Sequence, residues 1–378
     1  MLNRKSVINN DVIIKKLSDA GIENPEEDIK EIKKIVNKYI RNKIKNSKPK
    51  EDEQYKEGIP FFDVYPDYDF TKLPSWVKQN IEDARIYGNS KQMVILKDGR
   101  RYQLNNTLND LSGKEWNHFI NSVINTNYTT NGKDSCAHHI RKIHPTPKPP
   151  KLMKEIIEFF SKENEIIFDY FMGVGGTLLG AGMCSRRAVG IDLERKYIDA
   201  YKEAATEMGV PVFDCVEGDC MEILADDNKM QSLLGNEKIS LVLIDPPYGN
   251  MMSRKKTGAD IKVYGNVATP FTSSDKDFGN LDIYNFYDKL KESIQLILPY
   301  VKKKGYVVIF IKDLQPNKKE LNLLHADIIK KINEIPNLNY KGLRIWADRS
   351  AKLFPYGYPF SFVANQIHQY ILVFRKEK

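Results

Sequence analysis

From about residue 144 to the C-terminus, apolar runs of strand length alternate with segments whose apolar residues recur at helical spacing. The pattern predicts helices at about 150–161, 177–186, 194–208, 219–234, 283–299 and 319–333. It predicts strands near 165–170, 188–192, 212–217, 240–245 and 305–312, and a last strand over 367–375. Such alternation is typical of an α/β fold whose mostly parallel, doubly wound sheet carries helices on both faces. We expect this fold over a domain spanning 141–378.

The N-terminal part of the chain shows different patterns. Apolar residues between Ile29 and Ile44 fall at helical spacing, and the stretch Lys30–Lys50 holds nine Lys and Arg but one acid, Glu31. This predicts an amphipathic helix with a basic outer face, within a helical extension over 1–60. That face suits plain solvation, or contact with a polyanion or a second copy of the chain. Residues 61–140 are mixed and predict a small module with a helix at 76–86 and a hairpin over 93–104, turning at Asp98-Gly99.

The strand predicted at Ile239–Ile244 runs directly into Asp245-Pro246-Pro247-Tyr248. Two successive prolines donate no backbone hydrogen bonds and hold the chain extended. A carboxylate, the Pro246 carbonyl and an aromatic ring are thereby held together at the carboxyl end of a strand, where open α/β sheets bind ligands. Two acceptors suit the two hydrogens of an exocyclic amine, and the ring suits stacking on a base. The alternative is a rigid strand-to-loop turn in which Asp245 caps a helix.

A second motif precedes it. Glu165–Phe171 predicts a strand, Met172–Thr177 a glycine-rich turn before a helix, and Ala188–Asp192 the next strand. Glycines let the backbone approach a ligand, and an acid at the end of the second strand can bind ribose hydroxyls. The turn lacks the third glycine of a dinucleotide fingerprint, and no P-loop Lys-Ser/Thr follows. We therefore favour a nucleoside over a pyrophosphate as the ligand, and a tight turn without a ligand is the alternative.

These motifs together resemble a known family. The order Phe171-x-Gly173-x-Gly175, then Asp245-Pro246-Pro247-Tyr248, resembles the S-adenosylmethionine-dependent amino-methyltransferases of DNA, which methylate adenine N6 or cytosine N4. His144-Pro145-Thr146-Pro147-Lys148-Pro149 is similar to the cofactor-side motif of that family. The last strand and the stretch Asn109–Trp116 are softer matches. The resemblance covers roughly 105–378 and implies a Rossmann-like methyltransferase fold.

The resemblance also implies the cofactor, S-adenosyl-L-methionine, and the roles of individual residues. The expected catalytic residues are Asp245, Pro246, Pro247 and Tyr248. The expected cofactor-binding residues are His144, Pro145, Thr146, Lys148, Asp169, Phe171, Gly173, Gly175, Asp192 and Asp219. For Asp219 an ordinary helix N-cap is an equal alternative. No metal site is expected.

The expected reaction is direct methyl transfer to an amine on a flipped-out base of double-stranded DNA, with Tyr248 stacked on the base. Asp at the first position of the motif favours adenine N6 over cytosine N4 by family pattern. Two further alternatives are a tRNA guanosine-N2 methyltransferase, which shares the motif, and a non-catalytic DNA-binding relative. Because the last predicted strand nearly reaches Lys378, we expect target recognition within 61–135, 249–280 or 334–365.

Composition fits an intracellular enzyme acting on nucleic acid. The 378 residues are 41% hydrophobic and 29% charged, with a net charge of +8 that suits a polyanion. No apolar stretch approaches a membrane span and no signal peptide begins the chain, so we expect a cytoplasmic location. The four cysteines are expected to be reduced, and no Pro-Cys pair supports cytosine-C5 chemistry. A homodimer and a cognate restriction enzyme are partners that the sequence leaves open.

Overall fold

The structure is a computed structural model. It describes residues 53–249, 271–314, 323–349, 351 and 353–378, and before them only Lys15, Ser18, Asp19 and Pro25. The predicted basic helix within 1–60 and the basic residues Arg254–Lys262 lie outside the described residues. The chain forms two compact units, one from 1–68 and 80–101, the other from 69–79 and 102–378. The predicted module 61–140 is thus divided between the two.

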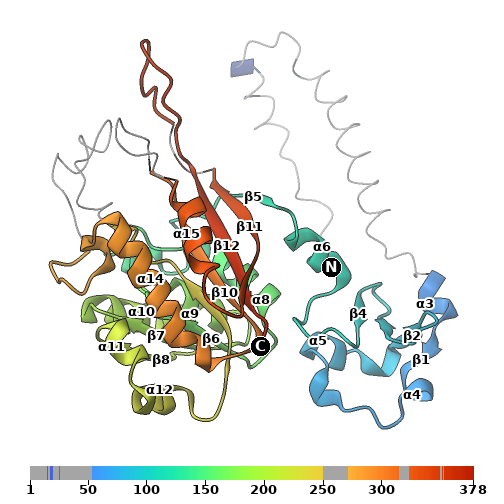
Figure 1. The fold of residues 1–378 in the computed structure, drawn as a ribbon. Coiled ribbons are helices and arrows are strands. Elements are labelled where there is room, and N and C mark those ends of the chain that lie inside the picture. The colour runs from blue at the N-terminus through green and yellow to red at the C-terminus, as the bar shows by residue number, and fades with distance from the viewer. Residues whose placement is uncertain are drawn as a thin grey trace. The chain divides into compact units, whose positions relative to one another are not determined.

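The first unit is built on short strands and an aromatic cluster. Its elements are α3 (Glu53–Glu57), β1 (Ile59–Pro60), α4 (Phe61–Val64), β2 (Arg85–Tyr87) and β3 (Met93–Ile95) (Figure 1). The small sheet is ordered β1-β2-β3-β4, and its last strand, β4 (Arg101–Gln103), begins at the residue where this unit ends. Phe61 is fully buried against the rings of Phe62, Tyr65 and Tyr68. The predicted hairpin turn at Gly99 is confirmed, because its N–H donates to the Leu96 carbonyl.

The second unit contains an eight-stranded sheet ordered β5-β11-β12-β10-β9-β6-β7-β8 (Figure 1). Its strands are β5 (Val123–Thr126), β6 (Ile166–Asp169), β7 (Arg187–Asp192), β8 (Asp214–Glu217), β9 (Ile239–Ile244), β10 (Val301–Ile311), β11 (Leu338–Asp348) and β12 (His368–Lys376). Neighbouring strands from β10 to β8 are parallel, and β12 is antiparallel to both β10 and β11. The predicted doubly wound, mostly parallel α/β fold is confirmed.

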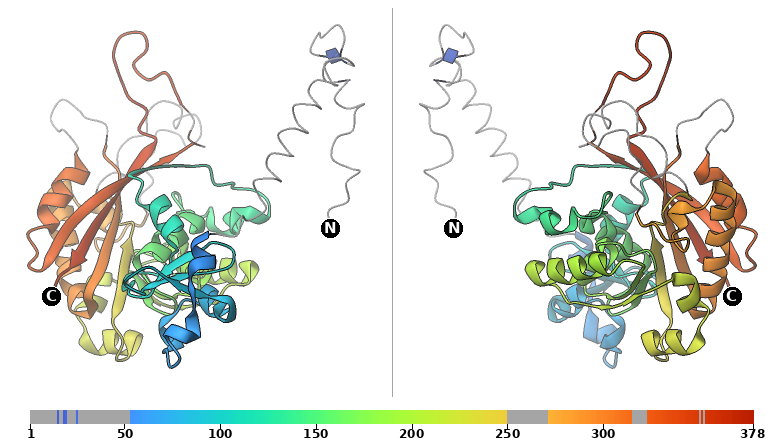
Figure 2. Two further views of the ribbon diagram at one scale, coloured as in Figure 1. Left: turned by 90° about the vertical axis from the view of Figure 1, so that its right-hand side faces the viewer. Right: turned by 90° about the vertical axis from the view of Figure 1, so that its left-hand side faces the viewer.

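Helices cover both faces of this sheet (Figures 1 and 2). One face packs against α11 (Cys220–Leu224), α12 (Asp227–Leu234), α14 (Ile283–Ile297) and α15 (Leu324–Ile332). The other packs against α8 (Pro150–Phe160), α9 (Gly176–Gly182) and α10 (Arg195–Met208). Alternate residues of each strand enter opposite cores, as Phe168 and Ile167 of β6 illustrate. The described part of the unit also contains the short helices α5 (Ser75–Lys78), α6 (Gly113–Phe119) and α7 (His138–Arg141).

Two predicted helices were wrong in part, and one strand was not predicted. The single helix expected over 219–234 is two, because Asp226 accepts hydrogen bonds from the N–H groups of Asn228 and Lys229 and so starts α12 anew. The helix expected at 76–86 is only α5, because the chain turns and joins the small sheet at β2. No strand was predicted within 334–365, yet 338–348 form the sheet strand β11. A bulge near Gly342 and half-exposed residues obscure its alternation.

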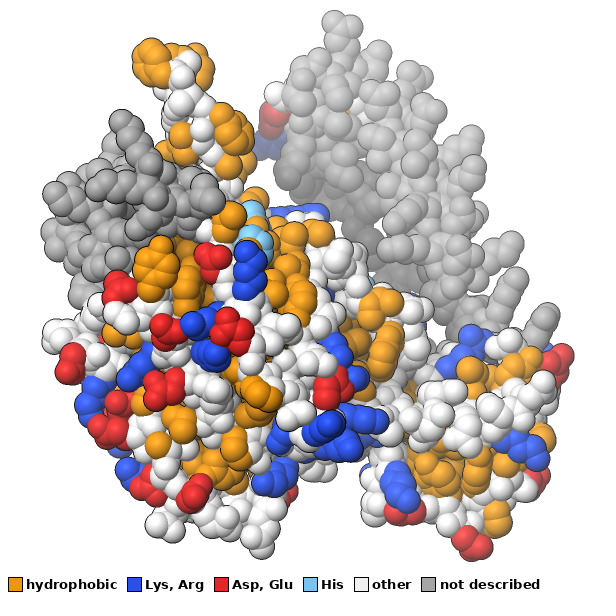
Figure 3. All heavy atoms as spheres, in the orientation of Figure 1, with side chains coloured by type: hydrophobic (Ala, Val, Ile, Leu, Met, Phe, Trp, Pro, Cys, Tyr) orange, Lys and Arg blue, Asp and Glu red, His pale blue; other side chains and the backbone are white. Residues whose placement is uncertain are grey.

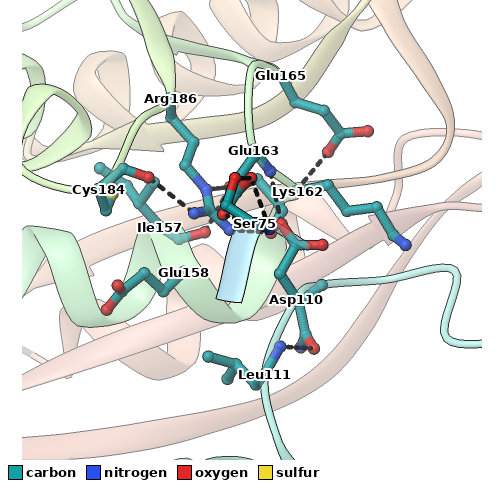
Figure 4. A network of polar contacts seen from close by, with 12 residues as sticks. Ser75, Asp110, Leu111, Ile157, Glu158, Lys162, Glu163, Glu165, Cys184 and Arg186 are labelled. Carbon is teal, nitrogen blue, oxygen red and sulfur yellow. Dashed lines mark hydrogen bonds and ion pairs between the residues drawn. The ribbon is translucent and has the colours of Figure 1, made fainter. Parts of the chain in front are cut away.

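A buried ion pair joins two segments of the second unit (Figure 4). Asp110 Oδ2 lies 3.2 Å from an Arg186 Nη2 and accepts the Glu163 N–H at 2.6 Å. Arg186 also donates to the carbonyls of Cys184 and Ser161. Burial raises the pKa of the Asp110 carboxyl, and the Glu163 N–H and Arg186 oppose that rise. The pair fastens the chain around Asp110 to α8 and β7.

Candidate active site

The carboxyl ends of the parallel strands surround a cavity of about 240 Å³. The chain runs from β6 outward to β7 and β8, and then returns to place β9 and β10 on the opposite side of β6. Ligands of open α/β sheets bind at such a switch point. Residues that end or follow five strands line the cavity, namely Asp169, Asp192, Gly218, Asp245 and Lys312.

The cavity gathers most of the residues that were predicted from the sequence. Those that line it are His144, Thr146, Lys148, Asp169, Phe171, Gly173, Asp192, Asp245, Pro246, Pro247 and Tyr248. Pro145, Gly175 and Asp219 are not among the lining residues. Asp219 is the N-cap of α11, where its carboxylate accepts the Met221 N–H at 2.9 Å. Gly175 has a different structural role.

Asp245 is held in place from two sides. Its Oδ1 accepts the hydroxyl of Tyr248 at 2.7 Å, and its Oδ2 lies 2.6 Å from the ammonium of Lys148. The Lys148 and Asp245 side chains are 9% and 17% exposed, so the ion pair is largely shielded from water. Such a pair fixes the plane of the carboxylate, and each oxygen still has a lone pair available to another donor.

Tyr248 and Lys148 make contacts that were not predicted from the sequence. Tyr248 is 6% exposed, and its hydroxyl donates a hydrogen bond to Asp245. The sequence predicted that its ring stacks on a base. Burial, reinforced by the Asp245 charge, raises the pKa of Tyr248 well above its usual value, so it remains a donor. Lys148 was assigned to the cofactor side, but its ammonium binds Asp245 and lies 5.2 Å from the centre of the Phe310 ring.

Arg141 shapes the segment that carries His144 and Lys148. Its guanidinium is 2% exposed and donates to the carbonyls of Cys136 at 3.0 Å and Lys148 at 2.8 Å. Burial lowers the pKa of Arg141 to about 10, which leaves it charged at neutral pH. Sequence reasoning missed this residue, because nothing in the local pattern distinguishes it from a surface arginine.

The glycine-rich turn follows β6 and is fastened to β7. The Gly173 N–H donates to Asp192 Oδ2 at 2.7 Å, and the Glu194 N–H donates to Asp192 Oδ1 at 2.9 Å. Gly175 has φ +73°, and a Cβ there would lie 2.1 Å from Cδ2 of Tyr201. Glycine is therefore needed at 175 for the close approach of α10.

Burial shifts the titration of the acidic groups in the cavity. It raises the pKa of Asp192 to about 6 and that of Asp169 to about 7, while backbone N–H donors oppose the shift at both. His144 stacks on Phe271 with ring centres 5.2 Å apart and meets the edge of Tyr197. Burial lowers the pKa of His144 to about 4, so its imidazole is neutral at pH 7.

Three further lining residues were not among the site residues predicted from the sequence. Asp277 is buried and accepts the N–H groups of Thr272 and Gly279. Gln369, on β12, has a buried Oε1 with no hydrogen-bond partner among the described residues. Lys312 follows β10. Within the described ranges no cluster of three or more His, Cys, Asp or Glu side chains could hold a metal ion. The same part of the chain has no helix long and apolar enough to cross a bilayer.

Among curated proteins, the chain resembles nucleic-acid methyltransferases. It is 32% identical over 132 residues to the type II methyltransferase M1.MboII of Moraxella bovis, covering 35% of this chain and 45% of that protein. It is 28% identical over 107 residues to a tRNA (guanine(10)-N2)-dimethyltransferase of Methanothermobacter thermautotrophicus, covering 28% of this chain and 29% of that protein. The chain therefore spans less than half of either relative.

Solved structures resemble the chain more remotely. NSun6 from Pyrococcus horikoshii superposes with a TM-score of 0.39 and 13% identity, covering 62% of this chain and 53% of that one. The decisive comparison is with a whole family: residues 3–203 match the N6_N4_Mtase family, described as DNA methylase. This match covers the glycine-rich turn, His144–Pro149 and Asp192. The chain belongs to the N6_N4_Mtase family of DNA methylases.

Proposed function

We propose that this chain methylates the exocyclic N6 amine of adenine in double-stranded DNA. The observation that carries the proposal is the Asp245 carboxylate, which lies in the cavity at the switch point of the sheet and is held by Tyr248 and Lys148. A fixed acceptor beside the Pro246 carbonyl, at the mouth of a nucleoside-sized cavity, suits an amine with two hydrogens.

Family membership implies S-adenosylmethionine as the methyl donor, and the residues present fit that group. Asp192 offers a carboxylate at the end of β7, where a ribose hydroxyl can donate to it. Gly173 has no side chain, so a ligand can approach its backbone closely, and its φ of +48° also favours glycine at this position. His144, Phe171 and Tyr197 add aromatic surfaces. When bound, the cofactor supplies a sulfonium methyl that needs no further activation.

The remaining task of the protein is to activate and align the amine. The lone pair of an aromatic amine is delocalised into the ring, which makes it a poor nucleophile. Asp245 and the Pro246 carbonyl would accept its two hydrogens, favour a pyramidal nitrogen and free that lone pair. The C–N bond forms as the C–S bond breaks, and the nitrogen then releases one proton to water. Lys148 offsets the charge of Asp245 and holds its orientation. The carboxylate is therefore already aligned when the amine binds.

The target base must leave the duplex, because its amine is inaccessible within the stack. We favour adenine over cytosine N4 because Asp, at position 245, occupies the first place of the motif. A cytosine-N4 product would retain the same chemistry at Asp245. The second candidate is a tRNA guanosine-N2 methyltransferase, which the resemblance to the tRNA enzyme of Methanothermobacter thermautotrophicus favours.

Methyl transfer in a mixture of nucleic acids tests the substrate class. The purified chain would be incubated with methyl-labelled S-adenosylmethionine, unmethylated double-stranded DNA and unmodified tRNA in equal mass. We expect the label in the DNA fraction, and a reaction without the chain sets the background. Label in tRNA with none in DNA would replace the DNA assignment by the tRNA one.

A further inference from the structure

The loop between β11 and β12 projects far from the body of the second unit (Figures 1 and 2). Its described residues are 349, 351 and 353–367, and it leaves the sheet at the carboxyl edge, since β11 ends and β12 begins there. Gln369, two residues after the loop, lines the active-site cavity. The projection and the cavity therefore lie on the same edge of the sheet.

The loop has a defined conformation. Asn365 clasps Phe354 through two hydrogen bonds, one from the Phe354 N–H and one to the Phe354 carbonyl, at 2.9 and 2.8 Å. Beyond this clasp, the Gly357 carbonyl accepts the N–H groups of Phe360 and Ser361 at 2.7 Å each. A Cβ at Gly357 would lie 2.3 Å from the Ser361 carbonyl oxygen, so the turn requires glycine.

This turn presents three aromatic rings to solvent, which we call the aromatic tip: Tyr358, Phe360 and Phe362. Their side chains are 81%, 93% and 93% exposed. Figure 3 shows hydrophobic side chains along the projecting loop. Phe354 and Tyr356, which precede the tip in the chain, are half-buried and contact each other, with ring centres 5.8 Å apart. The three rings are exposed to solvent and not packed in a core. Such exposed apolar surface indicates a partner with an apolar or aromatic interior.

Charge and reach favour a DNA duplex as that partner. The sequence holds no acidic residue between Asp348 and Glu377, and Arg349 lies exposed at the root of the loop. Nothing in this stretch would repel phosphates. Gln369 follows Phe362 by seven positions, a span of at most about 25 Å. A duplex whose flipped base enters the cavity therefore lies within reach of the tip.

We propose that the aromatic tip inserts into the base stack beside the target base and fills the space that the flipped base leaves. This inference rests on the proposed function. Apolar side chains inserted between base steps are a known means of unstacking DNA, and a ring can stack on any base. The tip thus lowers the cost of extrusion, while Asp245 acts on the extruded base.

Two exposed phenylalanines permit a clean test. Modification-sensitive sequencing of DNA treated with the unaltered chain first locates the methylated site. Two short duplexes containing that site are then compared, one fully paired and one with an abasic position opposite the target base. The Phe360→Ser/Phe362→Ser variant should methylate the paired duplex about 30-fold more slowly, equivalent to about 2 kcal/mol. On the abasic duplex, where extrusion is easier, it should fall within about threefold of the unaltered chain.

The Phe360→Tyr/Phe362→Tyr variant is the matched control, because it keeps both rings and should stay active on both duplexes. Equal losses on the paired and abasic duplexes, or no loss on either, would overturn the insertion role. An altered sedimentation coefficient of the serine variant without DNA would assign the tip to a second copy of the chain instead. If the unaltered chain methylates no DNA at all, the proposed function itself fails, and the insertion role with it.

Discussion

At the scale of single residues, Asp245 and Lys148 show how an anionic acceptor is kept in a shielded cavity. The sequence places Lys148 on the cofactor side, whereas its ammonium lies 2.6 Å from Oδ2 of Asp245. Local motifs identify both residues, but only the fold reveals that they meet. The carbonyl of Lys148 is held by Arg141, so a buried arginine contributes indirectly to the position of the carboxylate.

The raised pKa of Asp192 predicts that affinity for S-adenosylmethionine decreases at acidic pH. Burial raises its pKa to about 6, so its carboxylate becomes protonated as the pH falls through that value. Because the ionised form accepts a ribose hydroxyl best, affinity for S-adenosylmethionine should be constant above about pH 7 and fall by up to about tenfold per unit below about pH 6. Calorimetric titrations from acidic to neutral pH measure this.

The Asp192→Asn variant is the control for that titration. It should bind more weakly at neutral pH, by about 1–3 kcal/mol, and lose most of the pH dependence. A slope that survives in this variant would assign the titration to Asp169 instead, whose pKa burial raises to about 7.

At the scale of elements, the Asp110–Arg186 pair fastens a segment outside the sheet to α8 and β7 (Figure 4). Asp110→Ala would leave the Arg186 charge buried without its carboxylate and should destabilise the fold by about 3–5 kcal/mol. Asp199→Ala, which breaks the exposed pair of Asp199 with Arg195, should cost under about 1 kcal/mol. Thermal unfolding compares the two, and equal shifts in the melting temperature would argue against this fastening role.

The elements predicted best are those buried on both faces. Every residue of β9 is buried, so an uninterrupted apolar run marks it. β11 escaped prediction because its exposed and half-exposed residues alternate irregularly around Gly342. Helix boundaries depended on capping: the pattern predicted one helix where Asp226 starts a second. The periodicity of apolar residues predicts which residues are buried. Bulges and helix caps depend on contacts with other parts of the chain, so periodicity does not predict them.

At the scale of the whole molecule, the sequence identified the carboxyl edge of the sheet, and most of the site residues predicted from it line the cavity there. Continuous motifs, such as Asp245–Tyr248, can be found locally. Gln369 and Asp277 were not identified as site residues, because the fold, and not a local motif, brings their segments to the cavity. The position of target recognition stays a prediction, and residues 250–270 of the proposed recognition segment lie outside the described part of the chain.

The central claim is that Asp245 directs methyl transfer to a base amine in DNA. The most direct measurement is mass spectrometry of nucleosides from unmethylated DNA after incubation with S-adenosylmethionine and either the unaltered chain or Asp245→Ala. We predict N6-methyladenine with the unaltered chain and none with the variant, which should still bind the cofactor by calorimetry. N4-methylcytosine would change the base but keep the chemistry. DNA that carries neither product, or undiminished methylation by Asp245→Ala, would contradict the account.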